Sequence, residues 1–381
     1  MRFSIDAHAI GRHLTGNEVY VRSLLEGFAS LDKKSEFIAY TSVRGAEEHV
    51  PSRIRTRRVS ENPFVRLGLD LSRCALADAP DLLHVQYTAP LFCPAPIVVS
   101  IHDVSYLEHP EFFPATRRFQ LKLTVERTVR RAARILTLSE FSRQGIARSY
   151  GLDPDLITVV PAACSTIFKP ILRPKATSFV EGRFQITDPF VLSVGDLQPR
   201  KNPLGLIRAF EELVANCPEL PHHLVMVGKD TWYSSKVHQA AEHSPFGNRI
   251  HFTGYVDDSE LLQLYNACDI FVFPSFYEGF GIPILEAMAC GRAVACANTS
   301  AMPEVAGSAA LLFDPHNTEE MMRSMRDLLS NPELRARKER LGQQNAARFS
   351  WNRTARQTLE VYYEVAGQRA KQGQRAAVGR R

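Results

Sequence analysis

The sequence of 381 residues lacks the features that would mark a membrane, secreted or metal-binding protein. No apolar run approaches the roughly 20 residues that span a bilayer, and the start, MRFSIDAHAIG, has no long apolar core of the kind found in secretion signals. The seven cysteines form no CxxC pair, so neither a zinc site nor a disulfide framework is indicated. We therefore expect a cytoplasmic protein with reduced thiols, no metal and no cofactor.

Nucleic acids and dinucleotide cofactors are disfavoured as ligands for similar reasons. No GxGxxG follows the first predicted strand, which argues against a dinucleotide-dependent dehydrogenase. The net charge of +5 is only mildly basic, and no aromatic-and-basic recognition motif accompanies it. We expect no nucleic-acid partner.

Basic charge is concentrated in two places. Residues 117–134 have a helical pattern and contain seven Arg and Lys side chains but only one acidic side chain, Glu126. This helix suits peripheral contact with anionic lipid at the inner face of a membrane, or with a phosphorylated acceptor, while a solvated helix with local ion pairs explains the charges equally well. The tail 367–381 has five basic residues and little apolar content, so we predict that it is disordered.

Length and periodicity predict two α/β domains with parallel sheets. A chain of 381 residues exceeds the size at which a single core usually keeps growing. Short apolar runs alternate with helical stretches, which is the rhythm of a parallel sheet covered on both faces. The predicted strands are 3–5, 37–40, 82–85, 97–101, 135–138 and 157–160, then 190–194, 224–227, 250–252, 270–273 and 293–297. Because an irregular stretch separates the halves, we expect a cleft between them, with ligands beyond the carboxyl ends of the strands.

The stretch FVFPSFYEGFGIPILEAMACGRAVACANT at 271–299 predicts a strand, a glycine-containing turn, a short helix and a second strand. Glu278 falls in the turn, and Glu286 about one helical turn inside the helix. A helix start that follows a strand offers unpaired N–H groups to an anionic ligand. A carboxylate at such a position therefore requires a specific explanation. The helix is apolar around most of its circumference, which favours a cleft over a solvated face for Glu286.

Two further loops hold polar residues where strands end. Arg200 and Lys201 precede a helix whose predicted N-cap is Asn202, which favours a diphosphate site over a solvated basic pair. Gly16 lies near the start of a helix, where it would let a phosphate or a sugar approach the backbone. His102 follows strand 97–101 and can hydrogen-bond a sugar hydroxyl, although a lone histidine is more often structural.

Five segments, which cover most of the chain, carry a resemblance to a known family. They are PRKN at 199–202, GYVDDSELLQLYNACDIFVFPS at 254–275, EGFGIPILEAMACGRAVACANTSAMPEVAG at 278–307, IHDVSYLEHPEFFP at 101–114 and ILTLSEFSRQGI at 135–146. Together they resemble the retaining glycosyltransferases of family 4, most specifically through the Glu-x7-Glu spacing of Glu278 and Glu286. The resemblance implies the GT-B fold, in which two Rossmann-like domains flank a cleft and the second domain holds most of a nucleotide sugar.

The family pattern implies a role for each candidate site residue. Arg200 and Lys201 would neutralise the donor diphosphate without a metal, and Glu286 would hold the ribose hydroxyls. Glu278 and His102 would be the catalytic residues, the first at the transferred sugar and the second near the anomeric centre. The other donor-binding positions that the resemblance implies are Gly16, Val256, Asp258, Phe280, Gly281 and Ile282.

The resemblance also implies limits for the domains. The acceptor-side domain would span 1–170 and include a returning helix at about 352–366, and the donor domain would span 171–351. Two positions depart from the family pattern: Asp196 stands where many relatives have an Arg, and the insert RHLT separates two glycines that bound the loop 11–16.

The expected activity is transfer of a hexose to a glycan or lipid-linked acceptor in cell-surface polysaccharide synthesis. Segment 101–114 is similar to that of bacterial mannosyl- and rhamnosyltransferases, so GDP-mannose is the first choice of donor and UDP-sugars are the alternative. Two other classes stay open, a sugar-nucleotide epimerase of the same architecture and a non-catalytic sugar-nucleotide-binding subunit. Acceptor identity, linkage and oligomeric state are not encoded in these motifs.

Overall fold

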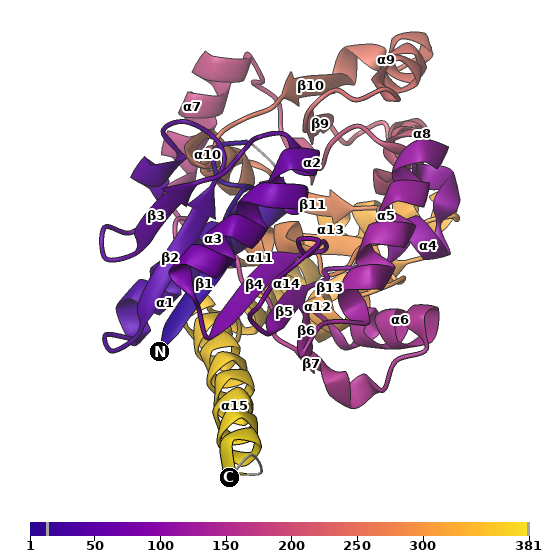
Figure 1. Ribbon diagram of the computed structural model, residues 1–381. Coiled ribbons are helices and arrows are strands. Elements are labelled where there is room, and N and C mark those ends of the chain that lie inside the picture. The colour runs from indigo at the N-terminus through magenta and orange to yellow at the C-terminus, as the bar shows by residue number, and fades with distance from the viewer. Residues whose placement is uncertain (13–14, 379–381) are drawn as a thin grey trace. The chain divides into compact units, whose positions relative to one another are not determined.

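The computed structural model describes residues 1–12 and 15–378, and the chain divides into two compact units. Unit 1 contains Met1–Ala162 and Ser350–Arg381, and unit 2 contains Ala163–Phe349 (Figure 1). Unit 1 is therefore built from two stretches that are far apart in the sequence. Residues 13 and 14 of the loop 11–16 lie outside the described residues.

A seven-stranded parallel sheet forms the centre of unit 1, with the order β3-β2-β1-β4-β5-β6-β7. Its strands are β1 (Arg2–Asp6), β2 (Glu36–Thr41), β3 (Arg55–Arg58), β4 (Leu82–Gln86), β5 (Ile97–Ser100), β6 (Arg134–Thr137) and β7 (Ile157–Val159). Every residue of β4 and β5 is buried, so both faces of the sheet are covered there. The six strands predicted for this half are confirmed.

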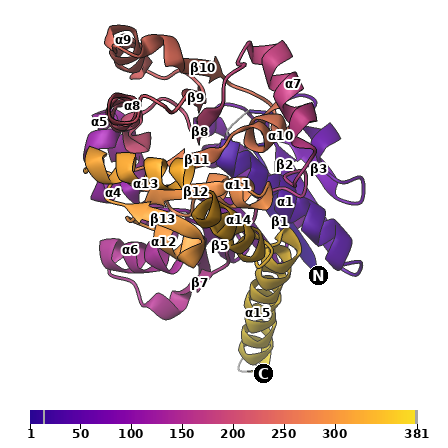
Figure 2. The same cartoon turned by 180° about the vertical axis from the view of Figure 1, so that it is seen from behind.

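The helices of unit 1 follow the strands in βαβ order. They are α1 (Thr15–Leu31), α2 (Pro63–Val65), α3 (Leu71–Asp78), α4 (Ser105–Glu108), α5 (Ala115–Val129), α6 (Glu140–Tyr150) and α15 (Trp351–Val378), with the π-helical turn η2 (Arg66–Asp70) between α2 and α3. The C-terminal helix α15 packs along α1 (Figure 2). The two helices approach closely at Gly27, where an added Cβ would lie 2.4 Å from the Cβ of Ala355.

Unit 2 is built around a six-stranded parallel sheet with the order β10-β9-β8-β11-β12-β13. Its strands are β8 (Phe190–Val194), β9 (His223–Val227), β10 (Ile250–Gly254), β11 (Ile270–Phe273), β12 (Ala293–Ala297) and β13 (Ala310–Phe313). Its helices are α7 (Arg173–Phe184), α8 (Pro203–Asn216), α9 (Ser234–His243), α10 (Asp258–Ala267), α11 (Ile282–Ala289), α12 (Met302–Ala306), α13 (Thr318–Ser330) and α14 (Pro332–Ala346). Side chains cap several helix starts, as when Asp257 and Glu260 form a capping box at α10.

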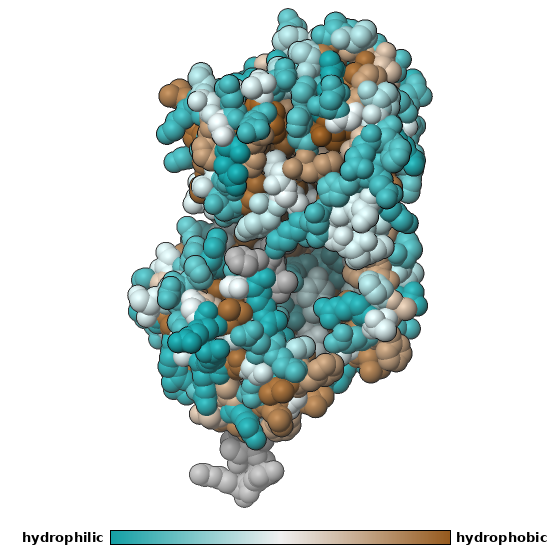
Figure 3. Space-filling view, turned by 90° about the horizontal axis from the view of Figure 1, so that it is seen from above, coloured by the Kyte–Doolittle hydropathy of each residue, from teal (hydrophilic) through white to brown (hydrophobic). Residues whose placement is uncertain are grey.

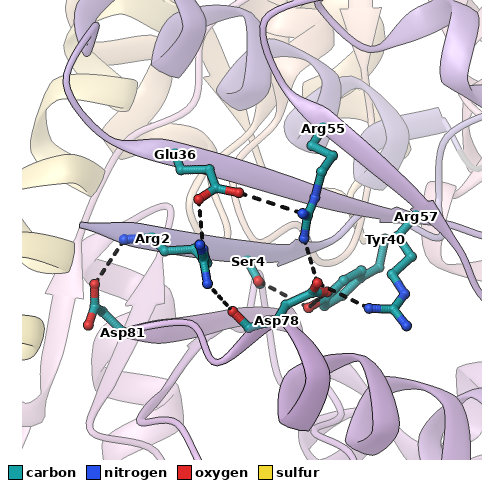
Figure 4. A network of polar contacts seen from close by, with 8 residues as sticks. All are labelled: Arg2, Ser4, Glu36, Tyr40, Arg55, Arg57, Asp78 and Asp81. Carbon is teal, nitrogen blue, oxygen red and sulfur yellow. Dashed lines mark hydrogen bonds and ion pairs between the residues drawn. The ribbon is translucent and has the colours of Figure 1, made fainter.

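A polar network holds the edge of the sheet in unit 1 (Figure 4). Arg55 and Arg57 of β3 lie 2.5 Å and 3.0 Å from Oδ1 of Asp78. The hydroxyl of Tyr40 donates to Oδ2 of Asp78 at 3.0 Å, and Arg2 donates to the Asp78 carbonyl at 2.6 Å. Strand β3 has the sequence RTRR, without an apolar residue, so ion pairs replace the apolar contacts that a periodicity analysis detects.

The structure differs from the sequence expectations at two basic segments. The helix predicted over 117–134 ends at Val129, because Arg134 already belongs to β6 and pairs with Val98 of β5. The structure continues α15 to Val378, where the sequence predicted disorder from 367, and residues 379–381 lie outside the described residues. Ala, Gln, Lys and Arg dominate this tail, and all four favour helix. None of the helices in the described part of the chain has the length and apolar character that a bilayer crossing requires.

We expect Gly27→Ala to destabilise unit 1 by about 1–3 kcal/mol, because the added methyl group forces α1 away from α15. This cost outweighs the gain of about 1 kcal/mol that alanine brings to a helix. Gly182→Ala in α7 is the matched control, since no atom lies within 4 Å of its added Cβ, and it should be slightly stabilising. Thermal unfolding followed by circular dichroism compares the two, and a Gly27→Ala protein as stable as the wild type would contradict this close approach.

Candidate functional site

The carboxyl ends of β8 and β11 lie side by side in unit 2, because the two strands pair in parallel at the centre of the sheet. Loop 195–202 follows β8, and loop 274–281 follows β11. The amide of Phe276 donates a hydrogen bond of 2.8 Å to the carbonyl of Arg200, which joins the two loops directly. The two loops therefore meet at the carboxyl edge of the sheet in unit 2.

Glu278 lies between the two cations of the PRKN segment. Nη1 of Arg200 lies 2.8 Å from its Oε2, and Nζ of Lys201 lies 2.6 Å from its Oε1. Nη1 of Arg200 also donates to the carbonyl of Tyr277 at 2.6 Å, and Nζ of Lys201 lies 4.9 Å from the ring centre of Phe273. The three charged side chains are mostly buried, with exposed fractions of 17%, 17% and 10% for Arg200, Lys201 and Glu278. We call this group the ion triad.

The ion triad carries one excess positive charge. Burial alone would raise the pKa of Glu278, but the charges of Arg200 and Lys201 outweigh burial and lower it to about 2. Burial lowers the pKa of Lys201 from its ordinary value, and the carboxylate of Glu278 opposes this shift. The three side chains together have a charge of +1, which an anionic ligand would complement.

The backbone of Glu278 is fixed by the loop that follows β12. Its N–H donates to Oγ of Ser300 at 2.9 Å, and its carbonyl accepts from the N–H of Ala301 at 3.3 Å. Ser300 has a φ of 55°, a conformation that non-glycine residues rarely adopt. Strain of this kind concentrates at functional sites. No sequence pattern pointed to Ser300.

Helix α11 begins directly after the loop of the ion triad. Gly281 precedes it with a φ of 108°, in the left-handed region that favours glycine, and Pro283 lies in the first turn, where its missing N–H costs little. Ile282 opens the helix, and the ring of Phe280 is buried edge-on against Phe349 at 5.8 Å. The predicted turn and helix start are confirmed.

Glu286 occupies a different environment one turn into α11. Its Oε2 accepts a hydrogen bond of 2.9 Å from the hydroxyl of Tyr265. Burial raises the pKa of Glu286 to about 7, the bond from Tyr265 opposes the rise, and the nearby charge of Asp258 adds to it. Val256 is buried just before α10, so three of the predicted donor-binding residues, Val256, Asp258 and Glu286, belong to neighbouring elements of unit 2.

Asp196, which departs from the family pattern, has a structural partner. Its Oδ1 accepts a hydrogen bond of 3.2 Å from the N–H of Lys229, in the loop that follows β9. The same two loops touch at Gly228, where a Cβ would lie 2.1 Å from the carbonyl oxygen of Gly195. Asp196 therefore holds two loops together, whereas Arg200 and Lys201 make the contacts with Glu278.

The two candidate residues of unit 1 lie at the carboxyl side of its sheet. His102 follows β5 and is 9% exposed, and its ring packs edge-on against Tyr20 and Tyr87, with centroids 4.7 Å and 5.7 Å apart. Burial lowers the pKa of His102 to about 4, so the ring is neutral at pH 7. Its carbonyl accepts from Oγ of Ser142 at 2.9 Å. Gly16 lies in the first turn of α1, and nothing lies within 4 Å of a Cβ placed there.

Sequence reasoning missed the residues that hold the candidate side chains in place. Tyr265 and Ser300 fall inside segments that carry the family resemblance, but neither received a role of its own. Among residues 1–12 and 15–378 there is also no group of three or more His, Cys, Asp or Glu side chains placed to hold a metal ion.

Two family descriptions match the chain. Residues 175–345 match "Glycosyl transferases group 1", and residues 14–166 match "Glycosyltransferase Family 4". The O-antigen chain mannosyltransferase B of Escherichia coli is 34% identical over 266 residues, which cover 70% of this chain and 69% of that protein. The serotype-specific mannosyltransferase WbdA of Escherichia coli is 28% identical over 70% of this chain, and the match spans about a third of its length, 32%.

Solved structures show the same fold at lower identity. The crystal structure of Anabaena Alr3699/HepE in complex with UDP-glucose superimposes with a TM-score of 0.76 at 20% identity, covering 95% of this chain and 99% of the other. The lipopolysaccharide glycosyltransferase WaaG superimposes with a TM-score of 0.73 at 16% identity, covering 95% and 99%.

We expect the Glu286 carboxyl to make unit 2 less stable as pH rises from about 4.5 to about 7. Its pKa is higher in the folded protein, about 7, than its ordinary value of 4.5, so the folded state binds more protons in this window and loses stability as they leave. Glu286→Gln keeps an acceptor for the Tyr265 hydroxyl but does not titrate. The melting temperature of this variant should therefore exceed that of the wild type by an amount that grows up to pH 7 and then stays constant.

Melting curves between pH 5 and 8 measure this difference. Glu278 does not interfere, because its pKa of about 2 places its loss of stability below pH 4.5. Parallel curves for the wild type and Glu286→Gln would show that the carboxyl is not perturbed.

Proposed function

Because the chain belongs to the glycosyltransferases of the group 1 and family 4 type, we propose that it transfers mannose from GDP-mannose to a growing cell-surface glycan. Membership confirms the family resemblance, and the two parallel-sheet units together with the structural neighbours confirm the GT-B fold. The chain is thus a glycosyltransferase that uses a nucleotide sugar. The base and sugar of the donor, the retaining stereochemistry and the lipid-linked acceptor are parts of the proposal.

The ion triad is the observation that carries this proposal. One excess positive charge lies beside the start of α11, whose first N–H groups and dipole also favour an anion. A departing nucleoside diphosphate develops negative charge, and preformed cations in a mostly buried site stabilise it without reorganisation. Arg200 and Lys201 would supply that stabilisation.

Glu278 would change partners when the donor binds. In the ion triad its two oxygens contact the same cations that a diphosphate would contact. A bound diphosphate would share those cations and free one carboxylate oxygen to accept a hydrogen bond from a hydroxyl of the transferred sugar. Glu286 would hold the ribose hydroxyls, and His102, which is neutral, would hydrogen-bond the sugar near its anomeric carbon.

The choice of mannose rests on the relatives. Both relatives described above are named mannosyltransferases, and one of them acts on an O-antigen chain. The structural neighbour with UDP-glucose keeps a UDP-sugar as the alternative donor.

Contact with a membrane surface is the second part of the proposal. On α5, Phe119 and Leu123 are 68% and 62% exposed and lie one helical turn apart, and Arg118 and Lys122 lie next to them in the sequence. Apolar side chains of this kind interrupt the otherwise polar surface of the molecule, as the brown atoms in Figure 3 illustrate. An apolar pair flanked by cations suits the headgroup region of anionic lipid.

Part of the basic stretch is used within the protein instead. Arg127 and Arg131 donate to backbone carbonyls of the loop 89–91, Arg130 pairs with Glu126, and Arg134 pairs with Glu364. The proposed membrane contact therefore rests on the first half of the predicted stretch 117–134.

We expect the wild-type protein to extend a lipid-linked mannan acceptor when it is supplied with labelled GDP-mannose, also in the presence of a chelator. Glu278→Ala should lower the rate of transfer more than about a hundredfold, because a hydrogen bond to a charged group is lost at the reacting sugar. Lys201→Ala should weaken GDP-mannose binding by about tenfold or more, because it removes one of the two cations of the site. Glu278→Ala should weaken that binding less than Lys201→Ala does. Calorimetric titration measures the binding, and Glu181→Ala and Lys175→Ala on the exposed face of α7 are controls.

Each other outcome identifies a different function. Interconversion of nucleotide sugars without an acceptor would indicate an epimerase, and binding without either reaction a scaffolding subunit. Extension from UDP-sugars alone would replace the proposed donor, and normal transfer by Glu278→Ala would remove its catalytic role.

We expect the protein to cosediment with vesicles that contain anionic phospholipid and not with purely zwitterionic vesicles. The double variant Phe119→Glu/Leu123→Glu should reduce this binding by about tenfold or more, because it replaces the apolar pair with charges that anionic lipid repels. Leu172→Glu is the control, since Leu172 is even more exposed, at 77%, but lies in unit 2. Equal sedimentation of all three proteins would exclude α5 as the contact.

A further inference from the structure

Four adjacent strands of the sheet in unit 1 end at buried polar side chains. In spatial order these strands are β1, β4, β5 and β6. Gln86 ends β4, His102 follows β5, Thr137 ends β6, and Arg66 of η2 lies 3.9 Å from Asp6 at the end of β1. Because the strands are parallel, all of these groups belong to one edge of the sheet, the edge at which α/β sheets bind ligands. We call them the edge groups.

The edge groups have unused hydrogen-bonding capacity. Within the described residues, no hydrogen-bond partner is present for either amide atom of Gln86, for either ring nitrogen of His102, for Oγ1 of Thr137, or for Nε and Nη1 of Arg66. All four side chains are at most 9% exposed. Native proteins leave few buried polar atoms without a hydrogen-bond partner, and the ion pair of Arg66 with Asp6 at 3.9 Å is too long to be a hydrogen bond.

Polar side chains deeper in the same unit show the opposite behaviour. The hydroxyls of Tyr20 and Ser100 lie 2.8 Å apart, Nε2 of His84 lies 2.7 Å from Ser100, and Nδ1 of His84 lies 2.6 Å from the hydroxyl of Tyr362. This chain of buried groups is satisfied along its length. Among the described residues of unit 1, most of the buried polar atoms that lack a hydrogen-bond partner lie at the carboxyl edge, and two others, in Trp351 and Gln357, lie on α15.

The backbone beside the edge groups is also strained. Tyr87, which follows Gln86, has a φ of 57°, and a bulky aromatic residue rarely adopts this conformation. Its ring contacts His102, with centroids 5.7 Å apart. Strained residues of this kind persist where a site requires their geometry.

We propose that Gln86, Thr137 and Arg66 of the edge groups bind hydroxyl groups of the acceptor glycan while His102 contacts the donor sugar, and that Gln86 is a residue that determines acceptor affinity. The inference rests on the proposed function, which requires an acceptor. A sugar hydroxyl both donates and accepts a hydrogen bond, as do the amide of Gln86 and the hydroxyl of Thr137. Arg66 adds donors, and Asp6 beside it adds an acceptor.

The same groups favour an uncharged sugar over a phosphorylated one. The carboxylate of Asp6 is 1% exposed and lies close to Arg66 and His8, at 3.9 Å and 3.1 Å. Its negative charge opposes a phosphate group at this position. A phosphate also offers mainly acceptor oxygens, which would leave Oε1 of Gln86 without a donor.

Gln86→Met tests the proposal because it separates binding from stability. The replacement has a similar shape but removes two unsatisfied polar atoms, so the melting temperature should stay the same or rise. With the donor at saturation, the KM for the mannan acceptor should rise about tenfold, the effect of losing one or two hydrogen bonds, while the dissociation constant for GDP-mannose stays unchanged. Thr137→Val is the second variant and should shift the acceptor KM in the same direction.

Gln357→Met is the matched control. Oε1 of Gln357 is likewise buried without a partner, but it lies on α15, away from the edge of the sheet, so its replacement should leave the acceptor KM unchanged. An acceptor KM that Gln86→Met and Thr137→Val both leave unchanged would overturn the inference while leaving the proposed transfer intact. A fall in melting temperature for both variants, without a change in KM, would identify the edge groups as structural.

A binding measurement that needs no turnover separates failure of the inference from failure of the proposed function. Ligand-observed NMR with mannotriose should show binding to the wild type and about tenfold weaker binding to Gln86→Met. Binding of inorganic phosphate, reduced by the same substitution, would contradict the preference for an uncharged sugar. If the wild type transfers no sugar but binds mannotriose through Gln86, the site stands and the proposed reaction falls.

Discussion

The placement of one carboxylate between two cations, across two neighbouring strands, is the constraint on which unit 2 depends. Removing one partner from a buried ion pair typically costs about 3–5 kcal/mol, so Glu278, Arg200 and Lys201 must be positioned together. Their loops can meet only if β8 and β11 are adjacent, and the hydrogen bond from Phe276 to Arg200 fixes the loops at a short separation. The strained Ser300 then holds Glu278 from the third side. The ion triad can therefore form only with this strand order of the sheet in unit 2.

The two glutamates of the Glu-x7-Glu spacing illustrate how strongly local surroundings control a side chain. Two cations lower the pKa of Glu278 to about 2, whereas burial beside Tyr265 raises that of Glu286 to about 7. At neutral pH the first is a permanent anion, and the second gains or loses its proton readily. Residues of the same type, in and just after one loop, are therefore suited to different partners, an ionic one and a hydroxylic one.

The sequence predicts those parts of the molecule that follow from apolar periodicity and turn chemistry. Eleven strands lie where short apolar runs indicated them, and Gly281 with Pro283 correctly marked the start of α11. The ion triad was predicted only as two separate elements, because an ion pair between distant loops leaves no periodic signal. Strand β3 was not predicted because its contacts are ionic, whereas β13, with the apolar sequence ALLF, was detectable and was overlooked.

Partners of a site residue are the hardest features to predict. Tyr265 is an apolar-face residue by periodicity, and only the fold shows that its hydroxyl reaches Glu286. Gln86, His102 and Thr137 lie at or just after the ends of three strands that the sequence separates, so their common position is a consequence of strand order.

The charged edge strand of unit 1 protects the protein against edge-to-edge aggregation at high protein concentration. An exposed edge strand offers unpaired N–H and C=O groups to any neighbouring chain and can nucleate aggregation. Strand β3 forms one edge of the seven-stranded sheet, and its arginines project charge along that edge while Asp78 holds them in place. A second molecule that tried to add a strand here would have to bring like charges together or break these ion pairs. The four residues of β3 therefore complete the sheet of unit 1 and also prevent a further strand from adding to it.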